Sequence, residues 1–168
     1  MNPKFMAKSI VVAAVYAALT FLCYPLSYGA VQFRLSEVMV LLAYIDPLYI
    51  PGLLLGCFLA NLLGTGGLVD AVFGTLASLV ALLLIHVTAK HGRQTLVSLI
   101  VASLWPSAAN CIVAFEMTFF LHSAQSFWFW AGMIALGEFV VVTLAGVPLF
   151  RYLMGKPHVI RIIRQIRD

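Results

Sequence analysis

Charge is scarce in this 168-residue chain. Only 10% of the residues are charged and 63% are hydrophobic, and the mean hydropathy is +1.05. An ordinary soluble domain carries about 25% charged residues, so this chain lacks the charge to cover a water-facing surface. A helix needs about 20 residues to cross the hydrocarbon core, and six crossings leave no room for a large domain outside it. We therefore predict a small integral membrane protein, and no nucleic-acid partner despite the net charge of +4.

Catalytic and metal-binding motifs are also lacking. The three cysteines, Cys23, Cys57 and Cys111, are widely spaced within apolar runs and show neither zinc-site nor disulfide-framework spacing. No HExxH motif and no nucleophile with a nearby base can be assembled. The glycine-rich turn at residues 64–67 lacks the Lys and Ser/Thr of a phosphate-binding P-loop. We expect no enzymatic activity, no metal and no cofactor in this chain.

Apolar segments account for most of the chain. We expect an all-α, six-helix transmembrane bundle that forms a single domain over residues 1–168. The expected helices cover about residues 7–24, 35–45, 48–63, 70–89, 95–121 and 127–152, followed by a basic tail over residues 153–168. The second segment is short because Asp46 precedes Pro47, and a proline disfavours helix at the residue before it.

The distribution of positive charge predicts the topology. Cytoplasmic loops are enriched in Lys and Arg. With six crossings and both termini in the cytoplasm, nine of the ten basic residues are cytoplasmic and only Arg34 lies outside. Without the short second segment, Lys90, Arg93 and the tail would also lie outside, so six crossings fit better. The tail places isoleucines and arginines at helical spacing, which suits either a helix lying on anionic membrane lipids or a solvated basic segment.

Small residues recur at every fourth position in two segments. They are Gly52, Gly56, Ala60 and Gly64 in the third segment, and Ala13 with Ala17, or in a second frame Ala14 with Ala18, in the first. Small residues at this spacing let membrane helices approach closely. The pattern indicates a helix contact, and leaves open whether that contact is internal or with another protein.

Most polar residues in the predicted helices gather toward the outer side. A carboxylate at the centre of a membrane helix costs about 2.5–3.5 kcal/mol on insertion scales, so such residues usually face the interior with a partner. Glu116 and Glu138 have no basic residue at their depth, which favours contact with a ligand over a protonated structural role.

Each of the other polar residues fits either a ligand-binding role or a structural role. Asp70 and Glu37 can bind a ligand or cap helices, and Arg34 can bind a ligand or pair with Glu37. Asn61 can contact a ligand or link helices. Trp105 shares a helical face with Glu116, where it could stack on a flat heterocycle, but it can equally be a core residue.

Several short motifs together resemble the queuosine-precursor transporter family (QueT). They are residues 32–37, Ile50-Pro51-Gly52-Leu53 through Cys57, residues 60–62, residues 70–77, Trp105-Pro106 with Asn110 and Glu116, and Gly137-Glu138. The resemblance implies six membrane helices in a bacterial cytoplasmic membrane. It also implies the substrate-binding S component of an energy-coupling factor (ECF) importer, with a membrane T component and two ATP-binding cassette subunits as partners that use the ATP.

The resemblance also implies a ligand and an interface. The ligand would be a 7-deazaguanine such as preQ1 or queuine, captured from outside. Glu116 and Glu138 would bind it with Asn61 and Asn110, and Gln32 and Arg34 would close over it. The family's Ala-x-x-x-Ala docking motif for the T component matches Ala13 and Ala17, or Ala14 and Ala18. Two alternatives stay open: an S component for another vitamin or purine-like nutrient, and a solitary carrier that uses Glu138 as a proton site.

Overall fold

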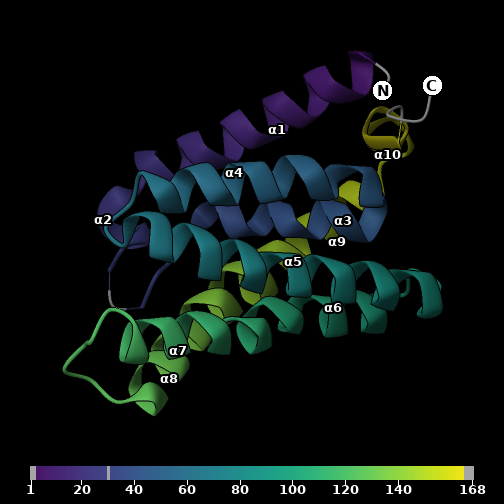
Figure 1. The fold of residues 1–168 in the computed structure, drawn as a ribbon. Helices are drawn as coiled ribbons and strands as arrows, with labels where there is room; N and C mark the ends of the chain where they lie inside the picture. Colours follow the sequence, from purple (N-terminus) through teal and green to yellow (C-terminus); the bar gives the residue numbers. More distant parts are fainter. Residues whose placement is uncertain (1–2, 30, 165–168) are drawn as a thin grey trace.

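The computed structural model describes residues 3–29 and 31–164, and these residues form helices joined by short turns (Figure 1). This confirms the all-α prediction. Four segments are long and apolar enough to cross a membrane: Phe5–Leu22, Gly67–His91, Leu96–Phe119 and Phe127–Met154. Two shorter apolar helical segments cover Leu35–Ile45 and Pro47–Leu62. The count of six crossings and the cytoplasmic location of both termini stay predictions.

The elements coincide broadly with the expected segments but contain additional breaks. In chain order they are α1 (Pro3–Leu22), α2 (Tyr24–Ser27), the 3-10 helix η1 (Leu35–Leu41), α3 (Leu42–Ile45), the 3-10 helix η2 (Pro47–Tyr49), α4 (Ile50–Leu62), α5 (Gly67–His91), α6 (Leu96–Ala109), α7 (Cys111–Phe119), α8 (Phe127–Glu138), the π-helix η3 (Phe139–Gly146), α9 (Val147–Met154) and α10 (Pro157–Arg164). Helix α1 packs on α4, α4 on α5 and α5 on α6, as Figure 1 shows.

The second expected segment is not a regular α-helix. It consists of seven residues of 3-10 helix followed by a four-residue α-helical turn. At about 2.0 Å and 1.5 Å per residue these reach roughly 20 Å, which is less than the hydrocarbon thickness of about 30 Å. Asp46 ends the segment, and its Oδ1 accepts a hydrogen bond of 3.0 Å from the Leu48 amide.

Two of the long segments are interrupted beside candidate residues. The fifth expected segment breaks at Asn110, four residues after Pro106. Proline has no backbone N–H and so cannot donate a helical hydrogen bond. The sixth widens into the π-helix η3 directly after Glu138. Such π-helical turns are rare and frequently lie at functional sites. The two breaks therefore lie at or next to Asn110 and Glu138, whose side chains they help to orient.

The small residues of α4 bring it into close contact with α1. A Cβ atom added at Gly56 would lie 2.8 Å from the Cβ of Tyr16, and one added at Gly52 would lie 2.8 Å from the Ser9 carbonyl. Gly52 and Gly56 therefore form a helix contact inside the bundle. Ala13 is only 2% exposed in this contact, so it is not accessible to a partner.

On α1, Ala17 is half-buried, whereas Ala14 and Ala18 are exposed.

The surface of the bundle is apolar. Leu22 is 82% exposed, Trp128 79% and Val97 71%, together with many other large hydrophobic side chains. A soluble monomer rarely exposes contiguous apolar surface on this scale. These side chains suit contact with lipid, which agrees with a membrane protein.

We call the two ends of the bundle the loop end, with residues 28–29, 31–34, 64–66 and 121–126, and the tail end, with residues 92–95 and 155–164 (Figure 1). The predicted basic tail forms α10 at the tail end. Tyr49 donates a hydrogen bond of 2.9 Å to the Ile163 carbonyl, and Ile160 and Ile163 pack against the core. Ile162 on the other side is exposed. The last four residues of the predicted tail, 165–168, lie outside the described residues.

Candidate ligand site

Arg34 is the centre of a buried polar cluster near the loop end. Its side chain is 7% exposed. Its Nη1 donates a hydrogen bond of 2.8 Å to Asn61 Oδ1, and its Nε donates one of 3.2 Å to the Ser27 carbonyl. Its guanidinium carbon lies 5.3 Å from the centre of the Tyr28 ring, within the range of a cation–π contact. These contacts fix the guanidinium inside the bundle although the residue belongs to a connecting segment.

Four acidic side chains interact electrostatically with this guanidinium. The charge of Arg34 acts on the side chains listed here: Glu37, Asp70, Glu116 and Glu138. Burial lowers the pKa of the Arg34 guanidinium, but Asp70 and the other acidic groups nearby raise it by more, so its pKa lies above the usual range. Arg34 therefore stays a cation. The cluster holds more acidic groups than this one cation can neutralise.

The carboxylates of Glu116 and Glu138 have unused acceptors. Glu138 is 3% exposed, and its Oε1 accepts a hydrogen bond of 2.8 Å from Asn110 Nδ2. Its Oε2 has no hydrogen-bond partner among the described residues, and neither has either oxygen of the fully buried Glu116. A buried polar group without a partner is costly, and a buried charge more so. These three oxygens are the atoms that an incoming donor would satisfy.

A cavity of about 70 Å³ opens beside Arg34 at the loop end. It is lined by Tyr28, Gln32, Arg34, Thr65, Gly66, Asp70, Met117 and Leu121. Pockets that bind small molecules usually measure about 300–1,000 Å³, so this space is small for a two-ring heterocycle. Gln32 and Asp70 thus line the cavity, whereas Glu116 and Glu138 are buried outside its lining. A ligand that reaches both glutamates requires the site to widen.

Trp105 does not join this cluster. Its Nε1 donates a hydrogen bond of 2.8 Å to Thr88 Oγ1, and its ring packs against the main hydrophobic core. Asn61 lies against Gly74 of α5, and Thr88 is fourteen residues further along the same helix. At 1.5 Å per residue this is a separation of roughly 20 Å along the helix. The structure therefore gives Trp105 the core role and not the stacking role.

Sequence reasoning missed a group of residues that support the site. Tyr16 donates a hydrogen bond to Glu37 Oε1, and the hydroxyls of Thr20 and Ser36 lie 2.7 Å apart. Tyr28, which lines the cavity, donates a hydrogen bond of 2.5 Å to the Ala60 carbonyl. Helical spacing places these residues on faces of their own helices, but it does not show which residue of another helix they meet.

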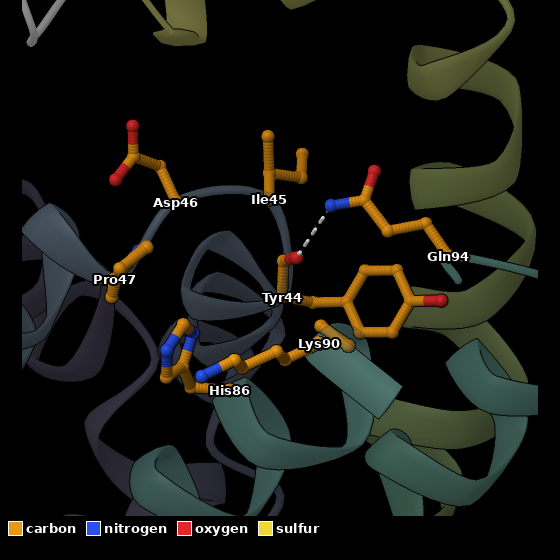
Figure 2. Close-up of a pocket in the computed structure, with 8 residues that line it drawn as sticks. Tyr44, Ile45, Asp46, Pro47, His86, Lys90 and Gln94 are labelled. Carbon is orange, nitrogen blue, oxygen red and sulfur yellow. Dashed lines mark hydrogen bonds between the residues drawn. The ribbon is translucent and has the colours of Figure 1, made fainter. Parts of the chain in front are cut away.

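A second hollow, of about 330 Å³, lies at the tail end, and Figure 2 shows the residues around it. It is lined by Tyr44, Ile45, Asp46, Pro47, His86, Ala89, Lys90 and Gln94. The Gln94 amide donates a hydrogen bond of 3.4 Å to the Tyr44 carbonyl across one side of it. No residue of the polar cluster around Arg34 lines this hollow. Glu116 and Glu138 therefore do not open toward it.

The fold and the cluster together define a class: a helical integral membrane protein with a polar site buried among its helices. The chain matches the sequence model described as the QueT transporter over residues 6–155, and it belongs to that family. This confirms the resemblance seen in the motifs. The queuosine precursor transporter QueT of Lactococcus lactis subsp. cremoris (strain MG1363) is 38% identical over 74 residues, which cover 43% of each chain. No solved structure matches the chain.

Proposed function

We propose that this protein is the substrate-binding S component of an ATP-driven ECF importer in a bacterial cytoplasmic membrane. It captures a queuosine precursor, a 7-deazaguanine such as preQ1 or queuine, from outside the cell. A membrane T component and two ATP-binding cassette subunits are its partners, and those subunits use the ATP. Membership of the QueT family supports the transport role.

The observation that carries this proposal is the set of unpartnered acidic oxygens inside the bundle. Glu116 presents two of them and Glu138 presents one. Both residues interact electrostatically with Arg34, and Gly137, next to Glu138, lies directly against the Val31 carbonyl in the segment that carries Arg34. A carboxylate buried without a partner favours a ligand that is itself a donor or a cation.

A 7-deazaguanine has the complementary chemistry. Its ring N–H and exocyclic amine form a row of donors that a carboxylate can accept in a bidentate manner, and the side-chain amine of preQ1 or queuine is a cation. We assign the ring edge to Glu116, because both of its oxygens lack a partner and can accept two donors side by side. Glu138, whose Oε1 already accepts from Asn110 and whose Oε2 is unpartnered, is assigned to the amine. Charge-assisted hydrogen bonds of this kind are the strong ones.

The two ends of the bundle support the proposed orientation. The loop end carries Arg34, the acidic cluster and the small cavity, whereas Lys90, Arg93 and Arg151 lie at the tail end. Lys and Arg are enriched in cytoplasmic segments, so the tail end faces the cytoplasm and the site opens outward. The exposed alanines of α1, Ala14 and Ala18, form the surface for the T component.

The test is ligand binding by the purified protein, measured by calorimetry with preQ1. Glu116→Gln and Glu138→Gln are each expected to weaken binding at least tenfold, because an amide replaces an acceptor oxygen with a donor. Asp46→Asn is the matched control, since it makes the same change in a buried carboxylate that caps η2 at the tail end. Its affinity should stay within twofold of the unmodified protein. Unchanged affinity in both glutamate variants would remove them from the site.

A solitary proton-coupled carrier is the second candidate. The unpartnered Oε2 of Glu138, inside a predicted membrane span, is the observation that favours it. Uptake of labelled preQ1 by cells that lack the T component separates the two functions. Uptake that persists there and collapses with a protonophore supports the carrier, and loss of uptake supports the S component.

A further inference from the structure

A chain of buried hydrogen bonds connects α1 with the candidate ligand site. At one end, the Tyr16 hydroxyl donates to Glu37 Oε1. One turn further along α1, the Thr20 hydroxyl lies 2.7 Å from the Ser36 hydroxyl, and the Ser27 hydroxyl donates a hydrogen bond of 2.9 Å to the Thr20 carbonyl. The Ser27 carbonyl in turn accepts from Arg34 Nε at 3.2 Å. The chain thus ends on the cation at the centre of the site.

These polar groups are buried as deeply as the hydrophobic core. Tyr16 is 1% exposed, and Thr20, Ser27 and Ser36 are fully buried. In such surroundings a lost hydrogen bond is not replaced by water, so each bond constrains the groups that it joins. The absence of a side chain at Gly56 is what lets α1 approach closely enough here, because a Cβ atom there would lie 2.8 Å from the Cβ of Tyr16.

Glu37, like Glu138, accepts a hydrogen bond from a neighbouring side chain, whereas Glu116 does not. The donor to Glu37 Oε1 is the Tyr16 hydroxyl. Glu37 also interacts electrostatically with Arg34 and with Glu138. Because the Tyr16 hydroxyl holds Glu37 and Glu37 interacts with the Arg34 cation, we give Glu37 a supporting role. The unpartnered oxygens of Glu116 and Glu138 then remain available to a ligand.

We propose that Tyr16 and Thr20 of α1 are positioning residues for the ligand site. They touch no ligand. Tyr16 holds the carboxylate of Glu37, and Thr20 holds the segment that carries Arg34, so that Glu116 and Glu138 stay correctly placed. This inference rests on the proposed ligand-binding function.

Tyr16→Phe tests the proposal with preQ1 binding to the purified full-length protein. We expect binding to weaken at least fivefold. Tyr44→Phe is the matched control, because Tyr44 is equally buried in the same core and its hydroxyl bonds Ser98 and the Thr95 carbonyl at the tail end. It should lose comparable thermal stability and bind within twofold of the unmodified protein. An unchanged affinity in Tyr16→Phe, or an equal loss in Tyr44→Phe, overturns the proposal.

A double-mutant cycle separates positioning from general loosening of the fold. In a Glu37→Gln background, Tyr16→Phe should weaken binding by less than twofold, since the bond that it removes is already altered. An undiminished fivefold effect in that background contradicts the proposed route through Glu37. Thr20→Val, which keeps the side-chain shape, gives a second measurement if Tyr16→Phe does not fold, with an expected loss of at least threefold. If the unmodified protein binds no 7-deazaguanine, the proposed function itself fails.

Discussion

At the scale of single residues, one buried guanidinium interacts electrostatically with four acidic side chains. Arg34 is held by Asn61 and by the Ser27 carbonyl, and its charge acts on the acidic groups around it. In the proposed function, this excess of acidic groups favours a cationic ligand. The stability of the protein also depends on Arg34, because its removal leaves buried acidic groups without this compensating cation.

Arg34→Gln should therefore reduce the free energy of unfolding by about 3–5 kcal/mol, the usual cost of removing one partner from a buried charged arrangement. Thermal unfolding in detergent measures this change. Arg151→Gln is the control, because Arg151 is exposed near the tail end and exposed substitutions usually change stability by less than about 0.5 kcal/mol. Equal melting temperatures of the two variants would show that Arg34 does not balance the cluster.

At the scale of elements, the site depends on close contacts between segments that are distant in the sequence. The segment of residues 31–34 lies directly on α8, since a Cβ atom at Gly137 would overlap the Val31 carbonyl. Glu138 follows Gly137, and Asn110 reaches Glu138 from the break between α6 and α7. The glycine therefore sets how near the connecting segment comes to the acidic side chains.

Gly137→Ala should push residues 31–34 away from α8 and cost about 1–3 kcal/mol of stability, as overpacking of a buried contact usually does. Binding of preQ1 should weaken as well. Gly132→Ala on the same helix is the control, because nothing lies within 4 Å of a Cβ atom there. It should be neutral or stabilising by up to about 1 kcal/mol, through helix propensity alone. Equal effects at the two positions would exclude a role for the contact with Val31.

At the scale of the whole molecule, α1 has two different faces. Its inner face packs on α4 through Ala13 and Tyr16, which are buried. Its outer face exposes Ala14 and Ala18 with Val11 and Val15. Small residues spaced by four on an exposed face allow close approach by another membrane helix. The second alanine frame, and not the frame that begins at Ala13, is therefore the accessible one.

The paired substitution Ala14→Leu and Ala18→Leu should abolish copurification with the T component and the ATPase subunits, while preQ1 binding stays within twofold. Copurification from cells that express the complete importer provides the measurement. Ala145→Leu, an equally small and exposed residue on η3, should leave the complex intact. A complex that survives the paired substitution would place the interface on another surface.

The sequence by itself determined the membrane environment, the approximate positions of the apolar segments and the family. These follow from composition and from residues close together in the chain. Only the tertiary structure decided that the second segment begins as a 3-10 helix, that Asn110 binds Glu138, that Trp105 binds Thr88 and that Tyr16 binds Glu37. Periodicity shows which residues share a face of one helix. The partner across the interface depends on how the helices are rotated and how closely they approach, which is settled by contacts such as those at Gly56 and Gly137.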